Sequence, residues 1–226
     1  AGPQPKTIDP SLNTALDGCY YVIHAFEGLT TKDKDGNIVG GVAESWEELD
    51  EGIRYICHLR TNAKWSDGKQ ITANDFEYSW KRAVNPNVAA EYAYMMEVVK
   101  NAKEINAGLM DYNNLGVKAI DDYTLEVILE NPTAYFLEFI ASTGIFMPVR
   151  KDIIETYKDE WTLTPETYIC NGPYKMTERL ADQKIVFSAN TNYYSKEEQI
   201  AKEITFIIMS DPNTVVAGLK NGTIHF

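Results

Sequence analysis

The spacing of apolar residues predicts that helices and strands alternate along this chain. From residue 13 onward, apolar side chains recur at helical intervals and predict a helix with one apolar face, formed by Leu16, Cys19, Tyr20, Ile23 and Phe26. Further along, Tyr55, Cys57 and Leu59 alternate with polar or outward-facing positions, as expected of a half-buried strand. The turn residues 50–52 precede this strand and predict a hairpin with residues 46–49.

A capping pattern predicts the start of a second helix. Thr72 and Asp75 have the spacing of a capping box, and Phe76, Trp80 and Ala83 then form an apolar stripe. We expect this helix to end before Pro86, because the residue before proline disfavours helical geometry. A further helix is predicted from about residue 88 to residue 105.

The rest of the chain gives a mixture of hairpins and short helices. Asp35-Gly36 predicts one tight hairpin turn and Asp121-Asp122 another, the latter within residues 117–129. Strands are expected at 174–177, 184–188 and 204–208, and helices after Pro132, at 151–158 and at 214–220. Because no regular strand–helix–strand period emerges, an α+β fold with mixed sheets fits better than a doubly wound fold. A strand that begins at 223–226 and stops there predicts that the sequence is part of a longer chain.

Composition and charge narrow the classes of function. The 226 residues are 44% hydrophobic and 24% charged, which is typical of a folded globular protein. Lys and Arg number 21 against 33 Asp and Glu, so the net charge is −12. This balance argues against a nucleic acid or an anionic lipid surface as a partner. No run of 18 apolar residues is present to span a membrane.

The sequence lacks the motifs that usually carry catalysis. It has neither a glycine-rich phosphate loop nor a G-x-S-x-G nucleophile motif, and its three histidines are scattered. We therefore expect no enzyme activity, no metal site and no cofactor. Cys19, Cys57 and Cys170 are interpreted as three separate thiols, with one disulfide and one remaining thiol as the alternative.

A series of short motifs is more informative when taken in order along the chain. The sequence resembles the solute-binding proteins of oligopeptide ABC transporters, the OppA-like group of extracellular solute-binding protein family 5. The segments that carry the resemblance cover nearly the whole chain: Thr7-Ile8-Asp9-Pro10, Phe26-Glu27-Gly28-Leu29, Gly41-Val42-Ala43-Glu44-Ser45-Trp46, Ala63-Lys64-Trp65-Ser66-Asp67-Gly68, Thr72-Ala73-Asn74-Asp75-Phe76, Asn131-Pro132-Thr133-Ala134-Tyr135-Phe136 and Asn171-Gly172-Pro173-Tyr174. Much of this signature has a structural interpretation, since Asp67-Gly68 suits a tight turn with Trp65 packed beneath it. Trp46, Phe76 and Trp80 are likewise expected in the core.

The resemblance implies a fold and a division into domains. It implies a type II periplasmic-binding-protein-like lobe with a smaller α+β domain inserted into it. On this chain the first lobe would comprise 1–27 and 151–226, and the inserted domain 28–150. The family's third lobe, which faces the first across the binding cleft, would be absent.

The resemblance also implies a function and a set of site residues. Family members are extracytoplasmic receptors, in the periplasm or at the cell surface with or without a lipid anchor, that deliver oligopeptides to a membrane permease. Thr14, Ala15 and Leu16 fall where the family lines the peptide with main chain, although the periodicity also allows Leu16 to be helix core. Tyr92 aligns with a tyrosine that faces the cleft, with ordinary packing as the alternative. Two other hypotheses remain. One is a relative that binds another solute, such as a nickel complex, haem or a signalling peptide. The other is a hydrolase on an α+β scaffold.

Overall fold

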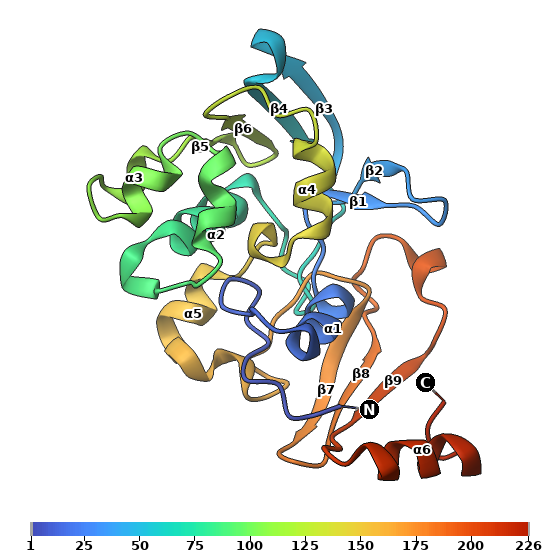
Figure 1. The fold of residues 1–226 in the computed structure, drawn as a ribbon. Helices are drawn as coiled ribbons and strands as arrows, with labels where there is room; N and C mark the ends of the chain where they lie inside the picture. Colours follow the sequence, from blue (N-terminus) through green and yellow to red (C-terminus); the bar gives the residue numbers. More distant parts are fainter. Residues whose placement is uncertain (1, 226) are drawn as a thin grey trace.

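A computed structural model describes residues 2–225, with Glu198 described by its backbone only. Within this range the strands form three antiparallel sheets (Figure 1). A two-stranded sheet pairs β1 (Thr30–Lys32) with β2 (Ile38–Gly40). A four-stranded sheet has the order β3-β4-β6-β5, from Ala43–Leu49, Arg54–Leu59, Thr124–Ile128 and Val117–Asp121. A three-stranded sheet has the order β7-β8-β9, from Tyr174–Leu180, Lys184–Ala189 and Glu203–Ile207.

Helices pack around these sheets. The α-helices are α1 (Leu16–Ala25), α2 (Ala73–Val84), α3 (Ala102–Asn106), α4 (Phe136–Ser142), α5 (Lys151–Tyr157) and α6 (Pro212–Asn221). The 3-10 helices are η1 (Asp50–Gly52), η2 (Pro86–Val88), η3 (Ala93–Val98), η4 (Tyr112–Asn114), η5 (Gly144–Phe146), η6 (Lys158–Thr162) and η7 (Lys196–Glu198). In Figure 1, α2 and α3 lie with the four-stranded sheet in the upper part of the molecule, and α1 lies with β7 in the lower part. None of these helices is long and apolar enough to cross a membrane, within the residues searched.

The expectation of mixed sheets is wrong, because each pair of neighbouring strands in the described residues is antiparallel. The α+β character is confirmed, since helices and antiparallel sheets make up the fold. The exception to antiparallel pairing is an isolated parallel bridge between Gly2 and Ile208. Residues 223–225 form no strand in the structure, and Phe226 lies outside the described residues.

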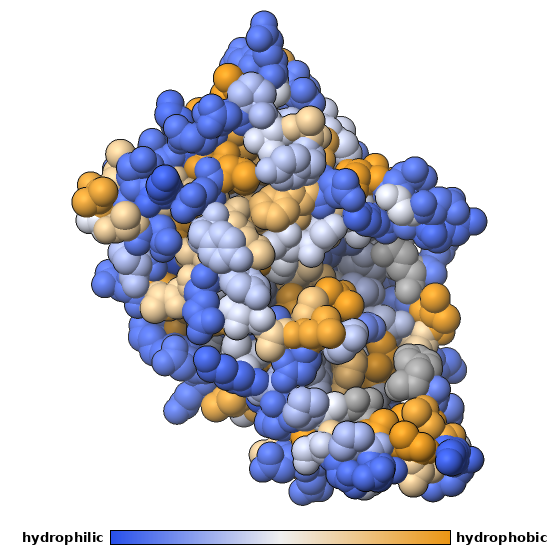
Figure 2. Space-filling model, in the orientation of Figure 1, coloured by the Kyte–Doolittle hydropathy of each residue, from blue (hydrophilic) through white to orange (hydrophobic). Residues whose placement is uncertain are grey.

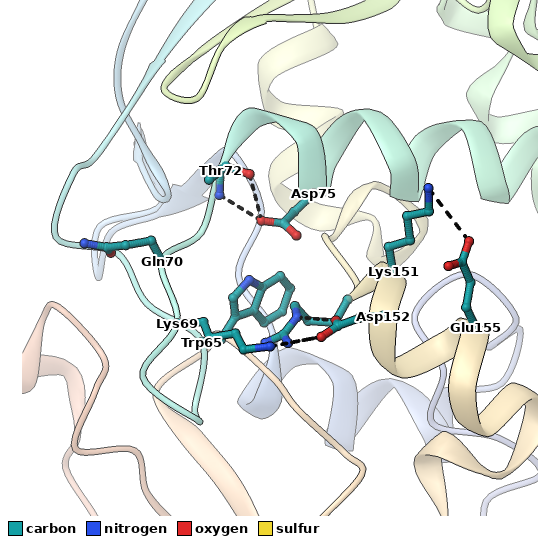
Figure 3. A pocket seen from close by; sticks show the side chains of 9 residues that line it. Trp65, Lys69, Gln70, Thr72, Asp75, Lys151, Asp152 and Glu155 are labelled. Carbon is teal, nitrogen blue, oxygen red and sulfur yellow. Dashed lines mark hydrogen bonds and ion pairs between the residues drawn. The ribbon is translucent and has the colours of Figure 1, made fainter.

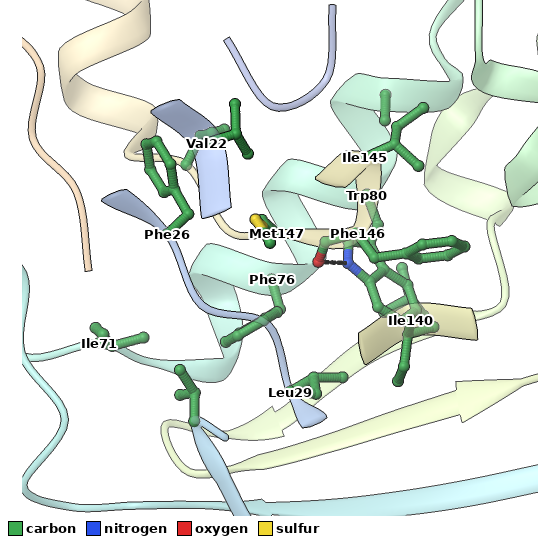
Figure 4. Packing of buried hydrophobic residues seen from close by; sticks show 14 of the residues in the cluster. Val22, Phe26, Leu29, Ile71, Phe76, Trp80, Ile140, Ile145, Phe146 and Met147 are labelled. Carbon is green, nitrogen blue, oxygen red and sulfur yellow. Dashed lines mark hydrogen bonds between the residues drawn. The ribbon is translucent and has the colours of Figure 1, made fainter. Parts of the chain in front are cut away.

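The core confirms the predicted stripe on α2. Phe76, Trp80 and Ala83 are fully buried, and the capping box forms, with the Thr72 N–H donating to the Asp75 carboxylate at 2.8 Å. The Trp80 indole N–H donates to the Phe146 carbonyl at 2.8 Å, and the two rings meet edge to face (Figure 4). Burial therefore costs the indole no hydrogen bond.

The predicted apolar face of α1 is wrong. The helix buries Gly18, Tyr21, Val22 and Ala25, whereas Leu16, Tyr20 and Ile23 are 69%, 49% and 49% exposed. The Tyr21 ring packs on Phe206 of β9, with centroids 4.5 Å apart. Gly18 packs so closely against the Thr7 carbonyl and the Asn13 side chain that a Cβ at this position would collide with them, so the inward-facing position requires glycine. Since α1 is apolar on most sides, periodicity alone could not select the buried one.

The predicted helix from 88 to 105 is also wrong. Ala89 and Asn101 adopt left-handed conformations, with φ of 54° and 67°, and divide the segment into η2, η3 and the short α3. Between η3 and α3 the chain pairs with the end of β6 instead: the Lys100 N–H donates to the Ile128 carbonyl and the Glu130 N–H to the Val98 carbonyl, both at 2.9 Å. This extended pairing excludes a continuous helix.

A buried ion pair joins the N-terminal segment to α2. The Asp9 side chain is 4% exposed and receives hydrogen bonds from both terminal nitrogens of Arg82, at 3.1 and 2.7 Å. The Trp161 indole N–H donates to the same carboxylate at 3.1 Å. One carboxylate thus ties together three segments that are distant in the sequence.

We expect Trp80→Ala to lower the free energy of unfolding by about 3–5 kcal/mol, because it empties a buried site and removes the bond to Phe146. Urea denaturation of the variant measures this change. Trp46→Ala is the control, since Trp46 is only partly buried and its loss should cost less. An equal cost for the two variants would contradict the buried role of Trp80.

We expect Cys19 to react with a thiol reagent in the folded protein at pH 8, while Cys57 and Cys170 stay unreactive. The three cysteines are unbonded in the structure. Burial raises the pKa of each thiol, to about 12 for Cys57 and Cys170, but Cys19 is only partly buried and a reagent can reach it. Titration should count one accessible thiol in the folded protein and three after denaturation without reductant. A single thiol after denaturation would reveal a disulfide.

Candidate functional site

The structure brings the four candidate site residues together. The Tyr92 hydroxyl donates to the Thr14 carbonyl at 3.1 Å, although the two residues are 78 positions apart. Tyr92 is the residue before η3, and Thr14 leads directly into α1 through Ala15 and Leu16. The contact is half-buried at the surface of the molecule, so the tyrosine is neither a core residue nor fully exposed.

The main chain at this contact offers hydrogen-bonding groups to one side. Ala15 is extended, with φ −117° and ψ 147°, and its own N–H and carbonyl bond to the Asn13 side-chain amide at 3.4 and 3.0 Å. In extended backbone, the carbonyl before a residue and the N–H after it point to the same side. The Leu16 N–H therefore points to the side on which Thr14 meets Tyr92. It has no hydrogen-bond partner within residues 2–225, as expected for the first residue of a helix.

An apolar surface continues from this point along α1. We call Leu16, Tyr20 and Ile23 the α1 surface; they are spaced about one helical turn apart, and each is exposed to 49% or more. Figure 2 shows apolar side chains gathered over α1 near the middle of the face in view. Single exposed apolar residues are common, but three adjacent ones on one helix face are typical of a surface that another surface covers. Leu16 is therefore not part of the core of the described residues, and its role as a ligand contact stays a prediction.

Two of the sequence motifs, the segments 26–29 and 171–174, bond to each other near the end of α1. The Glu27 N–H donates to the Asn171 side-chain oxygen at 3.1 Å, and the Asn171 amide donates to the Glu27 carbonyl at 2.9 Å. The Gly172 N–H donates to the Ala25 carbonyl at 2.7 Å, at a point where a Cβ would lie 2.6 Å from the Ala25 backbone. The Glu27 carboxylate accepts a bond from Tyr193 at 2.6 Å. These bonds fix the end of α1 against the start of β7.

The tight turn at 65–68 is structural, as the sequence predicted. Gly68 has φ of +91°, and Trp65 is fully buried beneath the turn. Beside it lies a shallow hollow of about 350 Å³, lined by Trp65 and by charged residues from α5 and the neighbouring loop (Figure 3).

The charges in this hollow satisfy one another. Arg150 donates to both oxygens of Asp152, at 2.7 and 2.6 Å, and to Asp67 at 3.0 Å, while Lys69 reaches Asp152 at 3.0 Å. The hydrogen bond from Arg150 holds the pKa of the Asp152 carboxyl well below its usual range. Burial raises the pKa of Asp75, and hydrogen bonds from Thr72 oppose that effect. The ion pairs of Arg150 therefore fasten the turn at 65–68 to α5.

A second hollow, of about 420 Å³, lies beside Tyr94. It is lined by Tyr94 and residues of η3, by the segment 130–135 and by Phe139 of α4. The Tyr94 ring also meets the Tyr92 ring edge to face, with centroids 5.9 Å apart.

The structure offers no arrangement for metal chemistry in the part that it describes. Among the residues searched, no three or more His, Cys, Asp or Glu side chains are grouped to hold an ion. The groups that converge at Tyr92 are a hydroxyl, main-chain atoms and apolar side chains. They can bind an elongated ligand through its backbone and its apolar parts. Sequence reasoning missed Tyr20 and Ile23 as surface residues; Gly18 was the available signal, since it marks the side of α1 that approaches other chain segments closely.

Comparison with known proteins agrees with this picture. Residues 37–226 match the family described as "Bacterial extracellular solute-binding proteins, family 5 Middle". The periplasmic oligopeptide-binding protein OppA of Salmonella typhimurium is 35% identical over 225 residues, covering 99% of this chain and 41% of that protein. The probable deoxycholate-binding periplasmic protein YgiS of Escherichia coli is 36% identical over 212 residues, covering 93% of this chain and 39% of that protein.

Solved structures give the same result. The structure of Listeria monocytogenes OppA bound to peptide superposes with a TM-score of 0.93 at 32% identity, covering 99% of this chain and 44% of that one. The chain thus spans about two fifths of the length of the curated relatives that it matches.

We expect Tyr92→Phe to lower the free energy of unfolding by about 0.5–1.5 kcal/mol, because it removes the hydroxyl bond to the Thr14 carbonyl and leaves the ring in place. Urea denaturation measures the change. Tyr94→Phe is the matched control, since the Tyr94 hydroxyl has no hydrogen bond in the described structure and its removal should change stability little. Equal effects of the two substitutions would show that the Tyr92–Thr14 bond contributes nothing.

Proposed function

This chain belongs to the family-5 bacterial extracellular solute-binding proteins, and from that premise we propose that it supplies one wall of the oligopeptide-binding cleft of an ABC-importer receptor. The family consists of solute-binding proteins and not of enzymes, which removes the hydrolase alternative. The observation that carries the proposal is the convergence of Tyr92, Thr14 and Leu16 beside an exposed apolar helix face.

Main-chain groups support a peptide as the ligand. The Leu16 N–H is available to donate to a peptide carbonyl, and the Thr14 carbonyl faces the same side. A peptide that pairs with main-chain groups can carry almost any side chain, so such a site suits a receptor of broad selectivity. The role of Thr14, Ala15, Leu16 and Tyr92 as ligand contacts is part of this proposal.

The α1 surface supports a second lobe opposite this one. An exposed apolar face on a helix is stabilised when another surface removes it from water, at roughly 25 cal/mol per Å² buried. In the proposed arrangement, residues 1–27 and 151–226 form one type II lobe and residues 28–150 a smaller inserted domain. An opposing lobe, outside this sequence, closes on the peptide by a hinge motion. The bonds between Glu27 and Asn171 are consistent with that division, because they join its two first-lobe segments.

The proposed setting follows from the family. The protein acts outside the cytoplasm, in the periplasm or at the cell surface, and its partners are the oligopeptide and the membrane permease that receives it. A different solute is the competing function, and the name of the YgiS relative, a probable deoxycholate-binding protein, gives it a specific form. The mass of the ligand that co-purifies with the longer protein carrying this chain separates the two: a mixture of short peptides supports the proposal, and a single non-peptide solute overturns it.

We expect the longer protein to bind tri- to pentapeptides in calorimetry, and residues 1–226 alone to give no saturable heat at micromolar concentration. One wall in water exchanges hydrogen bonds with solvent at a net gain of only about 0.5–1.5 kcal/mol each, which does not offset the several kcal/mol lost on association. Circular dichroism of both proteins is the control for folding. Micromolar binding by residues 1–226 alone would show that the cleft is contained within them.

A further inference from the structure

The hollow of about 420 Å³ beside Tyr94 contains aromatic rings and carboxylates that the proposed peptide contact at Thr14–Leu16 does not involve. Its walls come from η3 on one side and from the start of α4 on the other. We call it the aromatic groove, defined by Tyr94, Glu97, Glu130, Tyr135 and Phe139.

Aromatic rings form its walls and are held at fixed angles. Tyr135 meets Phe139 edge to face at 6.1 Å, and Phe139 is itself anchored against the buried Phe146 at 5.4 Å. Tyr94 and Tyr135 are nevertheless 55% and 60% exposed. Two tyrosines on anchored supports thus present ring surface to whatever enters the groove, with little further ordering needed when it binds.

Two carboxylates accompany the rings. Glu97 and Glu130 line the groove, and neither forms an ion pair with a Lys or Arg in the described part of the chain. Glu130 accepts a hydrogen bond from the Asn101 N–H at 3.1 Å, which steadies the carboxylate without neutralising it. The hollow at Trp65 differs in this respect, because each of its carboxylates on α5 is paired with a cation.

Ring faces together with uncompensated carboxylates are complementary to an organic cation. The face of a tyrosine ring attracts an ammonium or guanidinium group, and a carboxylate adds both charge and hydrogen-bond acceptors. An anionic or purely apolar occupant would leave the two carboxylates opposite it without compensation.

One residue that lines the groove contacts a residue of the proposed peptide site. Tyr92 bonds to Thr14 with its hydroxyl and meets Tyr94 with its ring, and Tyr94 lines the groove. The aliphatic stem of a lysine or arginine side chain can pack along such rings while its charged head meets the carboxylates.

We infer that the aromatic groove is a subsite for a lysine or arginine side chain of the bound peptide. This inference rests on the proposed function, and it assigns to this chain a preference for basic peptides at one position of the ligand.

The test is a lysine scan of pentaalanine, with calorimetry on the longer protein that carries this chain. Each position in turn holds lysine or norleucine, which share a carbon stem of the same length and differ in the charged amine. At one position, lysine should bind about two- to fivefold more tightly than norleucine, the range expected for a cation–aromatic contact of this exposure. Raising the salt concentration should shrink the difference.

Matched variants show whether the preference originates in the groove. Glu97→Gln combined with Glu130→Gln should abolish the lysine advantage and leave the affinity for norleucine peptides within about twofold. Glu104→Gln combined with Glu166→Gln makes the same change in net charge at exposed carboxylates outside the groove, and should preserve the advantage. Tyr135→Leu keeps an apolar wall without a ring face and should reduce it.

The outcomes separate the two levels of the argument. If alanine peptides bind but lysine has no advantage at any position, or if the advantage survives in the Glu97/Glu130 variant, the subsite is overturned and the proposed function stands. If no peptide binds at all, the proposed function and the subsite fail together.

Discussion

A buried carboxylate determines how the chain is assembled around the proposed site. Removing Asp9 from water would cost several kcal/mol if its charge were unpaired, so the fold must bring compensating donors to it. Arg82 comes from α2 and Trp161 from η6, and both reach the same carboxylate. The Ser11 backbone N–H donates to the Asp9 carboxylate as well, at 2.9 Å, and the Asn13 N–H donates to the Asp9 backbone carbonyl at 2.9 Å. The position of the chain just before Thr14 is thereby fixed relative to α2, and with it the place where Tyr92 can meet Thr14.

Sequence patterns correctly predicted the elements that depend on interactions between residues close together in the sequence. The capping box at Thr72, the alternation along β4 and the hairpin of β5 with β6 each depend on contacts within a few residues. The structure confirms all three, with the hairpin turn at Asp122-Tyr123, one residue later than predicted. The inward face of α1 and the path of residues 88–105 were predicted wrongly. In both cases the decisive partner, Phe206 for α1 and the end of β6 for Lys100, lies more than 25 residues away in the sequence. Apolar periodicity contains no information about such partners.

The motifs that identify the family and the groups proposed to bind the ligand are largely different residues. Asp67-Gly68 forms a turn and Asn171 bridges two chain segments, so both motifs have a structural role in the fold. The proposed contacts at Thr14 and Leu16 are main-chain groups, which every residue type possesses. Only the resemblance to a family could point to them from sequence, because side-chain chemistry does not distinguish them. The aromatic groove is different, since rings and carboxylates are recognisable, but η3 and α4 must fold together before they become neighbours.

The bonds between Glu27 and Asn171 also affect the order in which parts of the chain can fold during synthesis. They span 144 residues, and those from Trp161 to Asp9 and from Tyr168 to Ile8 span 152 and 160. At the usual pace of about 5–20 residues per second, a ribosome needs roughly 7–29 seconds to make the intervening stretch. During that interval β3, β4, β5, β6 and α2 can pair among themselves, because their contacts are closer in sequence. Asp9 and Thr14 can meet Arg82 and Tyr92 early, but Asp9, Ile8 and Glu27 gain their bonds to Trp161, Tyr168 and Asn171 only when the later part of the chain has been made.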